Sequence, residues 1–171
     1  MELLKELLSG NTVIGKVEWI GLSSSSRSEI ATPNSATVVP GGIDGDHHCR
    51  PKRSSKREVT LIQAEHIAAV AGILRRSEID PRLLRRNFVV SGINLASLKY
   101  QTFRIGTAVL KGTGNCPPCS RMEENLGHGG YSAMLNHGGI TAVVVTEGVV
   151  GIGDSVEALL EFGVNDASRD S

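Results

Sequence analysis

The chain has 171 residues, of which 40% are hydrophobic and 21% charged, values typical of one soluble domain rather than a disordered or membrane-spanning chain. Its 20 glycines against one Trp, two Tyr and three Phe favour turns and close backbone approaches over a helical bundle. The net charge is zero, but residues 1–121 carry 17 basic and 10 acidic residues, whereas residues 122–171 carry 1 and 8. This asymmetry indicates an anionic partner, such as a phosphorylated cofactor or a nucleic acid.

The first part of the chain predicts little regular structure. Met1–Leu8 is expected to form a short amphipathic helix, and it lacks the basic-then-apolar layout of a signal peptide. No apolar run is long enough to span a membrane, so we expect a cytoplasmic protein. Val13–Leu22 alternates as a half-buried strand does. A long loop from Ser23 to Arg57 follows, with one short apolar run at Thr37–Val39, and such segments are usually functional or disordered.

The remainder predicts short strands and short helices. The expected elements are, in order, a strand over Val59–Ile62, a helix over Gln63–Arg76, a short helix over Arg82–Arg86, a strand from Phe88 to Val90, two strand pieces within Phe103–Thr113 bent at Gly106, short helices over Met122–Leu126 and Tyr131–Leu135, and strands over Ile140–Thr146 and Ser155–Leu160. The predicted fold is mainly β, a closed or nearly closed β-barrel with a few short helices. We expect a single domain over residues 1–171, with its core at 13–160 and a polar tail at 163–171.

The three cysteines are the first candidates for chemistry. Cys116 and Cys119 form a Cys-x-x-Cys after a predicted strand, and Cys49 stands alone, which in a reducing compartment points to metal or redox chemistry. A reactive cysteine acts as its thiolate, which is favoured by nearby cations and helix N-termini, and Arg121 and a helix expected near Ser120 supply both.

Three interpretations of these cysteines compete. A thioredoxin-like dithiol is disfavoured because no long helix follows the motif. A zinc site that joins Cys49 or His47/His48 to Cys116 and Cys119 stays open. So does a single cysteine that ligates a soft metal otherwise held by an anionic organic cofactor.

Two basic clusters favour an anionic ligand. Arg50–Arg57 has five cations in eight residues and no acid, and Arg82–Arg86 adds a second group. Guanidinium groups bind phosphate through paired hydrogen bonds. Nucleic acid is the weaker candidate, because no aromatic residue is interleaved with these clusters and no helix-turn-helix or finger pattern is present.

The segment Asp44–His48 is a further candidate for metal binding or acid-base chemistry. If this segment is a strand, His47 and His48 point to opposite faces, so at most one of them enters a shared site. The chain has no phosphate-binding glycine loop and no serine-hydrolase elbow, so nucleotide or ester hydrolysis is unsupported.

The order of several short motifs resembles one known family. These motifs are Gly45–His47, Arg57–Ile62 with Glu65, Leu84–Leu95, Phe103–Gly106, Cys116–Cys119 with Arg121 and Met122, Gly138–Ile140 and Val150–Val156. Together they are similar to the MOSC domain, named for the C-terminal region of molybdenum-cofactor sulfurases, in its small stand-alone bacterial form. The resemblance runs from about Val13 to Leu160.

The resemblance implies a β-barrel that binds the molybdenum cofactor or handles sulfur destined for a metal centre. It implies that Cys119 ligates molybdenum and that Arg85 and Asn87 contact the cofactor. Further cofactor-binding candidates are Arg57, Thr60, Lys52, Arg53, His47 and Arg121.

Relatives in this family reduce N-hydroxylated bases and amidoximes, so the resemblance implies a reductase of N-hydroxylated or N-oxide small molecules. The chain has no ferredoxin-like cysteine set and no flavin motif, so such a reductase needs an external electron-donor protein. The alternative is a non-catalytic carrier of sulfur or cofactor that uses Cys119 and a cysteine desulfurase-type partner. Pyridoxal phosphate would enter only through a separate sulfurase partner.

Overall fold

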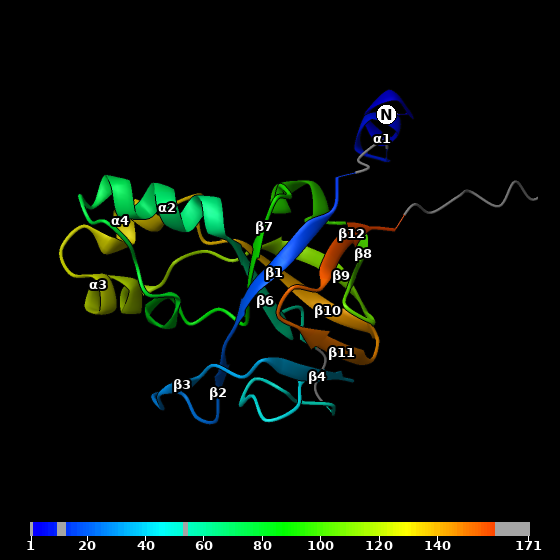
Figure 1. Cartoon of the computed structure of the whole chain (residues 1–171), viewed down its shortest axis with the longest axis horizontal. Helices are drawn as coiled ribbons and strands as arrows, with labels where there is room; N and C mark the ends of the chain where they lie inside the picture. The colour runs from blue at the N-terminus through cyan, green and yellow to red at the C-terminus, as the bar shows by residue number, and fades with distance from the viewer. Residues whose placement is uncertain (1, 10–12, 53–54, 160–171) are drawn as a thin grey trace, which may run out of the picture.

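The computed structural model describes residues 2–9, 13–52 and 55–159 and is built around a closed seven-stranded barrel (Figure 1). Going round the barrel, the strands are β1 (Gly15–Ile20), β12 (Ser155–Ala158), β8 (Thr102–Ile105), β9 (Ala108–Asn115), β10 (Ile140–Thr146), β6 (Val59–Gln63) and β7 (Phe88–Ser91). The predicted mainly β fold with a closed barrel and short helices is confirmed. The tail at 163–171 lies outside the described residues.

Alternation of apolar and polar residues directs the strands onto the barrel core. In β1, Val17 and Ile20 are buried while Lys16 and Glu18 are exposed, and the register shift between Val17 and Trp19 allows two residues three apart to face inward. The interior is filled by aliphatic side chains and two phenylalanines, Phe88 and Phe103. This rigid interior fixes the loops at the barrel ends, where sites are commonly built.

The pair β6 and β7 departs from this alternation, because both of its faces are buried. The two strands are parallel, with Leu61 paired to Phe88 and Ile62 to Val89. Leu61 and Phe88 belong to the barrel core, whereas Ile62 and Val89 belong to a second apolar cluster outside the barrel. A parallel pair needs a crossover connection, which here carries the helix α2 (Ala64–Ile73).

The helices that form this second cluster lie together on one side of the barrel (Figure 1). They are α2, the 3-10 helix η1 (Pro81–Leu84), α3 (Ser120–Leu126) and α4 (Gly130–Met134). The 3-10 helix η2 (Leu95–Leu98), which the sequence analysis missed, and α1 (Glu2–Ser9) complete the helices. None of the described helices has the length and apolarity that crossing a membrane would need.

The predicted helix boundaries are close to the observed ones. The helix expected over Gln63–Arg76 ends early, at Ile73. The short helix η1 begins as predicted, with the Asp80 side chain accepting from the backbone of Arg82 and Pro81 in the first turn. It ends at Leu84, because Arg85 takes the left-handed conformation with φ 55°.

The prediction of an irregular loop from Ser23 to Arg57 is wrong in part. The segment contains β3 (Ile30–Ala31), β4 (Ser35–Val39) and β5 (Gly42–Ile43), and its first residue ends β2 (Leu22–Ser23). Strand β4 pairs with β11 (Gly148–Gly151), far along the chain, as well as with β5. The segment resembles a loop because β3 and β5 have only two residues each, and the alternation in β4 is short.

Candidate functional site

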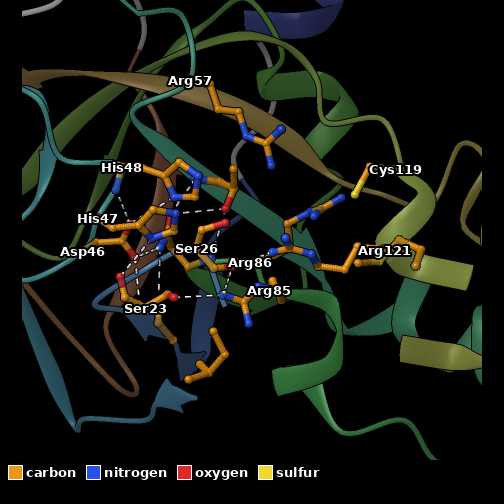
Figure 2. Close-up of a pocket in the computed structure, with 15 residues that line it drawn as sticks. Ser23, Ser26, Asp46, His47, His48, Arg57, Arg85, Arg86, Cys119 and Arg121 are labelled. Atoms are coloured by element: carbon orange, nitrogen blue, oxygen red, sulfur yellow. Dashed lines mark hydrogen bonds and ion pairs between the residues drawn. The ribbon is translucent and has the colours of Figure 1, made fainter. Parts of the chain in front are cut away.

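A cavity of about 120 Å³ opens at one end of the barrel (Figure 2). Its walls come from the segment after β1, the turn that carries Asp46, the region where β6 and β7 begin, and the start of α3. The lining residues are Gly21, Ser23, Ser26, Ile30, Asp46, His47, His48, Arg57, Thr60, Arg85, Arg86, Asn87, Cys119, Arg121 and Met122. Most of the lining residues are therefore of polar or charged type.

The buried residues Asn87 and Thr60 form a fixed part of the wall. The Asn87 side-chain oxygen accepts from the Thr60 backbone at 3.0 Å and its hydroxyl at 3.2 Å. The Asn87 side-chain amide donates to the Gly21 carbonyl at 3.2 Å and to the Asp46 carboxylate at 3.1 Å. Both groups are thus held by protein atoms, and their main effect is to lock β6, β7 and the Asp46 turn together.

Asp46 is a buried carboxylate with many hydrogen-bond donors around it. It accepts from the Ser23 backbone at 3.1 Å, from the His48 backbone at 3.0 Å and from His48 Nδ1 at 3.2 Å, in addition to Asn87. Burial acts to raise the pKa of Asp46, but the hydrogen bonds from His48 and Ser23 outweigh it, and the pKa is lowered below its ordinary 3.8. Asp46 is therefore ionised at neutral pH.

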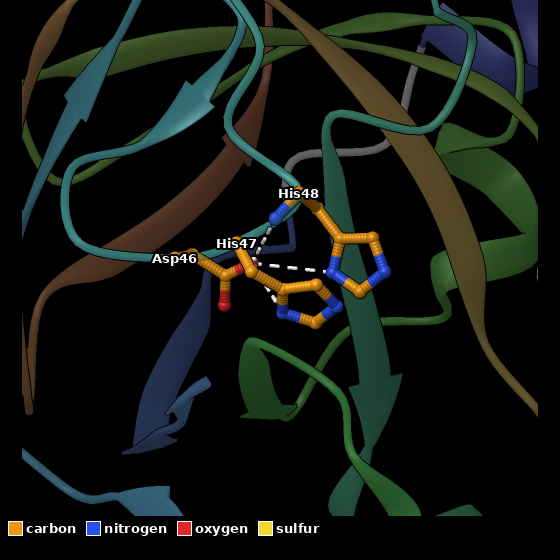
Figure 3. A group of neighbouring side chains, drawn as sticks. All are labelled: Asp46, His47 and His48. Atoms are coloured by element: carbon orange, nitrogen blue, oxygen red, sulfur yellow. Dashed lines mark hydrogen bonds and ion pairs between the residues drawn. The ribbon is translucent and has the colours of Figure 1, made fainter. Parts of the chain in front are cut away.

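His47 and His48 lie side by side in the cavity wall (Figure 3). Their ring centroids are 3.8 Å apart, and His47 Nδ1 is 3.0 Å from the Ser23 carbonyl oxygen. The expectation that at most one of them enters the site is wrong, because the segment is a turn and not a strand. With Nδ1 of each ring held by an acceptor, Nε2 of each ring is left for other partners.

The zinc hypothesis that unites these histidines with both cysteines is contradicted. Among the described residues, the group able to hold a metal through three or more side chains is Asp46, His47 and His48, without a cysteine. Cys119 lines the main cavity, whereas Cys116 is 1% exposed and lines a different one. The two cysteines therefore do not share one cavity.

Four arginines surround the cavity, and none forms an ion pair with a described carboxylate. Arg86 is the most buried, with 4% exposure. It donates to the carbonyls of Gly138 at 2.9 Å, Leu84 at 3.0 Å and Cys116 at 3.5 Å. Burial lowers the pKa of Arg86, yet a guanidinium in a protein stays protonated. Arg86 thus brings a buried positive charge close to the Cys116–Cys119 loop.

Arg85 and Arg121 bind the serine-rich segment Ser23–Ser28. Arg85 donates to the Ser28 carbonyl at 3.2 Å, the Ser23 hydroxyl at 2.9 Å and the Ser26 carbonyl at 3.2 Å. Arg121 donates to the same Ser26 carbonyl at 2.6 Å. Burial is the main cause that lowers the pKa of Arg85, followed by the positive charge of Arg121.

Cys119 lies across the cavity from the two histidines (Figure 2). It is the N-cap residue of α3, with φ −120° and ψ 174°, and it is exposed and free of a disulfide. The helix that the sequence analysis expects near Ser120 begins at that residue. Cys119 is therefore exposed to solvent and shares its cavity with the four arginines.

Most of the predicted site residues share this one cavity. Those that line it are His47, Arg57, Thr60, Arg85, Asn87, Cys119 and Arg121. Lys52 is exposed and is absent from the lining, and Arg53 lies outside the described residues. Asp46 and His48 were expected only as part of the segment Asp44–His48, and Arg86 only as part of the basic cluster Arg82–Arg86, whereas Ser23 and Ser26 were not expected at the site. Arg86 lies two residues before the apolar run Phe88–Val90, which is the signal that could have found it, and the serines carry none.

Comparisons with known proteins agree with the resemblance seen in the sequence. The model of the MOSC domain family matches residues 44–157, and a search of curated proteins finds no match. The crystal structure of the YuaD protein from Bacillus subtilis has a TM-score of 0.74 at 23% identity, covering 85% of this chain and 95% of that chain.

Two further solved structures have the same fold. YiiM from Escherichia coli has a TM-score of 0.64 at 16% identity, covering 85% of this chain and 70% of that chain. YiiM from Geobacillus stearothermophilus has a TM-score of 0.68 at 15% identity, covering 88% and 77%. At these identities the likeness establishes the fold and leaves the chemistry to be argued from the cavity itself.

Proposed function

The chain belongs to the MOSC domain family, and from this premise we propose that its cavity binds the molybdenum cofactor. The observation that carries the proposal is the charge around the cavity. Arg57, Arg85, Arg86 and Arg121 line it, while Asp46 is the carboxylate among the lining residues. Such an excess of positive charge favours an anionic ligand with a phosphate group, which guanidinium groups bind through paired hydrogen bonds.

The donor set fits this cofactor on two counts. Arg86 is a buried cation with backbone carbonyls as its partners and no counter-ion among the described residues, and a bound anion offsets the cost of such a charge. Cys119 offers a soft sulfur ligand at the same cavity, which suits a soft metal centre. The proposed roles are phosphate binding for the arginines and metal ligation for Cys119.

When bound, the cofactor supplies two-electron chemistry at molybdenum, and the protein supplies binding and orientation. The arginines hold the anion, and the network of Thr60, Asn87 and Asp46 keeps the wall rigid. His47 and His48 have Nδ1 held by Ser23 and Asp46, so their Nε2 atoms are placed to hold or release a proton for a small substrate. We propose that this substrate is an N-hydroxylated or N-oxide compound, reduced with electrons from an external donor protein.

The first test measures molybdenum in protein purified from a host that makes the cofactor. We expect nearly one molybdenum per chain in the wild type and a loss of at least several-fold in Cys119→Ala. Cys49→Ala is the matched control, because Cys49 is absent from the cavity lining, and it should keep its molybdenum. Wild-type protein without molybdenum, in a host that loads other molybdenum enzymes, contradicts the proposal.

The second test measures reduction of an N-hydroxylated base with a chemical electron donor. We expect turnover by molybdenum-loaded wild type and Cys49→Ala, and none by Cys119→Ala. A thermal unfolding midpoint of Cys119→Ala equal to that of the wild type shows that the loss is chemical. Full turnover by Cys119→Ala contradicts the ligand role of this residue.

The exposure of Cys119 favours a second candidate function, the carriage of sulfur or of cofactor to another protein. An exposed thiol can accept a sulfur atom as a persulfide from a cysteine desulfurase-type partner and transfer it onward. Mass spectrometry of the freshly purified protein would then detect sulfane sulfur on Cys119. Persulfide on Cys119 without turnover by the metal-loaded protein supports this function over the reductase.

A further inference from the structure

A second cavity lies outside the one that holds Cys119. It has a volume of about 110 Å³ and is lined by Arg27, Arg85, Arg121, Glu124 and Asn125. Arg85 and Arg121 line both cavities, so the two spaces are neighbours that share these side chains as part of their walls. Anionic groups in the two cavities would therefore be bound by the same pair of arginines.

The second cavity is also positively charged. Three guanidinium groups face it against a single carboxylate, that of Glu124, which forms no ion pair with a described residue. Arg27 is exposed, and its guanidinium has no hydrogen bond or ion pair with the described residues. Burial, Arg121 and Arg27 all act to lower the pKa of Arg85. An anion placed among these groups relieves their mutual repulsion.

The Ser26 carbonyl shows that two of these arginines already converge on one oxygen atom. Arg85 and Arg121 both donate to it, at 3.2 and 2.6 Å. These donations use only part of the donors that a guanidinium carries. Arg27 follows Ser26 directly in the chain and lines the same cavity. The hydrogen bonds to the Ser23–Ser28 segment account for the positions of Arg85 and Arg121. They do not account for the position of Arg27 in the same cavity.

We infer that Arg27, Arg85 and Arg121 form a second oxyanion subsite, which binds a second phosphoryl group of the ligand held in the Cys119 cavity. The inference rests on the proposed function in that it assigns a polyphosphate or dinucleotide character to the same ligand. The first cavity holds one phosphoryl group near Arg86, and the subsite holds the next one near Arg27.

Isothermal titration of the full chain with inorganic phosphate, pyrophosphate and tripolyphosphate tests the subsite. Arg27→Gln should weaken binding of pyrophosphate or tripolyphosphate about tenfold, while inorganic phosphate binding to the first cavity is unchanged. The affinity of Arg27→Lys for pyrophosphate and tripolyphosphate should lie between those of the wild type and Arg27→Gln, because lysine keeps the charge and loses the planar guanidinium group. Arg27 is exposed and unpaired, so these variants should fold like the wild type, as a thermal melt will check.

Arg104→Gln is the matched control, since it removes one positive charge from the β8–β12 surface, where Arg104 pairs with Glu157. It should leave all three affinities unchanged. Equal weakening of polyphosphate binding by Arg27→Gln and Arg104→Gln would reveal a general charge effect and overturn the subsite. So would unchanged polyphosphate affinity in Arg27→Gln.

The outcome is separable from that of the proposed function, because none of the three probes contains molybdenum. A molybdenum-free wild type with Arg27-dependent polyphosphate binding keeps the subsite and rejects the cofactor. Molybdenum in the purified wild type, together with no effect of Arg27→Gln on polyphosphate binding to the cofactor-free protein, rejects the subsite and keeps the cofactor.

Discussion

Arg86 shows how a single buried side chain can serve the fold and the cavity at once. Its guanidinium joins the end of η1 to the Gly138 turn and to the loop that begins at Cys116. Backbone carbonyls alone surround it as hydrogen-bond partners, so the positive charge is not cancelled locally. The same contacts that hold the cysteine loop therefore leave a charge available to an anion.

We predict that Arg86→Gln lowers the free energy of unfolding by about 3 kcal/mol, because buried carbonyls lose charged hydrogen-bond donors. Denaturant-induced unfolding at neutral pH measures the loss. Arg104→Gln on the surface, where Arg104 pairs with Glu157, should cost less than about 1 kcal/mol. Similar losses in the two variants would show that the Arg86 contacts contribute little.

The lowered pKa of Asp46 predicts how the stability of the fold changes with acid. Because its pKa is lowered in the folded state, its ionised form stabilises the fold above the ordinary value of 3.8. This contribution disappears as the pH falls through the lowered folded-state pKa. Asp46→Asn should cost about 2 kcal/mol at pH 7, and the difference from wild type should shrink as the pH falls below about 4. A difference that is independent of pH would contradict the role of the charge.

At the scale of elements, local sequence patterns predicted the helix starts, bends and strands that depend on neighbouring residues. The helix start at Asp80 and Pro81, the bend at Gly106 and the strand Ile140–Thr146 all follow from capping, glycine geometry or apolar runs, and the structure has them. The strands β3, β4 and β5 were missed because they depend on short pairings and on β11. Strands β3 and β5 have two residues each and no periodicity to detect, whereas the five-residue β4 was noticed only as the apolar run Thr37–Val39.

Sequence motifs predicted some of the site residues and missed those that depend on contacts between distant segments. Arg85, Asn87 and Cys119 came from motif order, and all three line the cavity. At most one of His47 and His48 was expected in a shared site if the segment were a strand, and the turn instead brings both rings to one wall. Ser23 and Ser26 reach the site through hydrogen bonds to Arg85 and Arg121, which are far away in the sequence, so no local pattern predicts their contribution.

The start of β10 supplies a test of how tightly the elements pack. Gly139 has φ 85°, and a Cβ atom there would collide with the Leu61 carbonyl of β6. Gly139→Ala should therefore cost more than about 3 kcal/mol of unfolding free energy. Gly153, with φ 91° and open space around it, isolates the backbone cost, and Gly153→Ala should lose only about 1 kcal/mol. Equal losses by denaturant unfolding would contradict the close approach.

At the scale of the whole molecule, the excess of basic residues in the first 121 positions gathers in part at one cavity. Anions that bind the folded chain should therefore stabilise it. We expect inorganic phosphate to raise the thermal unfolding midpoint above that in chloride at equal ionic strength, by several degrees at about a hundredfold excess over the Kd.

Arg57→Gln is the matching variant for this measurement. The Arg57 side chain lines the cavity with no ion pair or side-chain hydrogen bond among the described residues, so its loss should leave the fold in chloride unchanged and reduce the gain from phosphate. An equal gain in both proteins would point to the general stabilising effect of phosphate as a salt and contradict specific binding.

The closure of the barrel has a consequence for how the protein is made. Strand β1 pairs on one side with β7 and on the other with β12, through Gly15 with Val156 and Lys16 with Ser155. During translation β12 is the last of the described strands to emerge from the ribosome. One edge of β1 therefore stays unpaired until β12 has emerged. An exposed strand edge is a site of mispairing between chains. The chain is therefore most vulnerable to aggregation in the period before β12 has emerged and paired with β1.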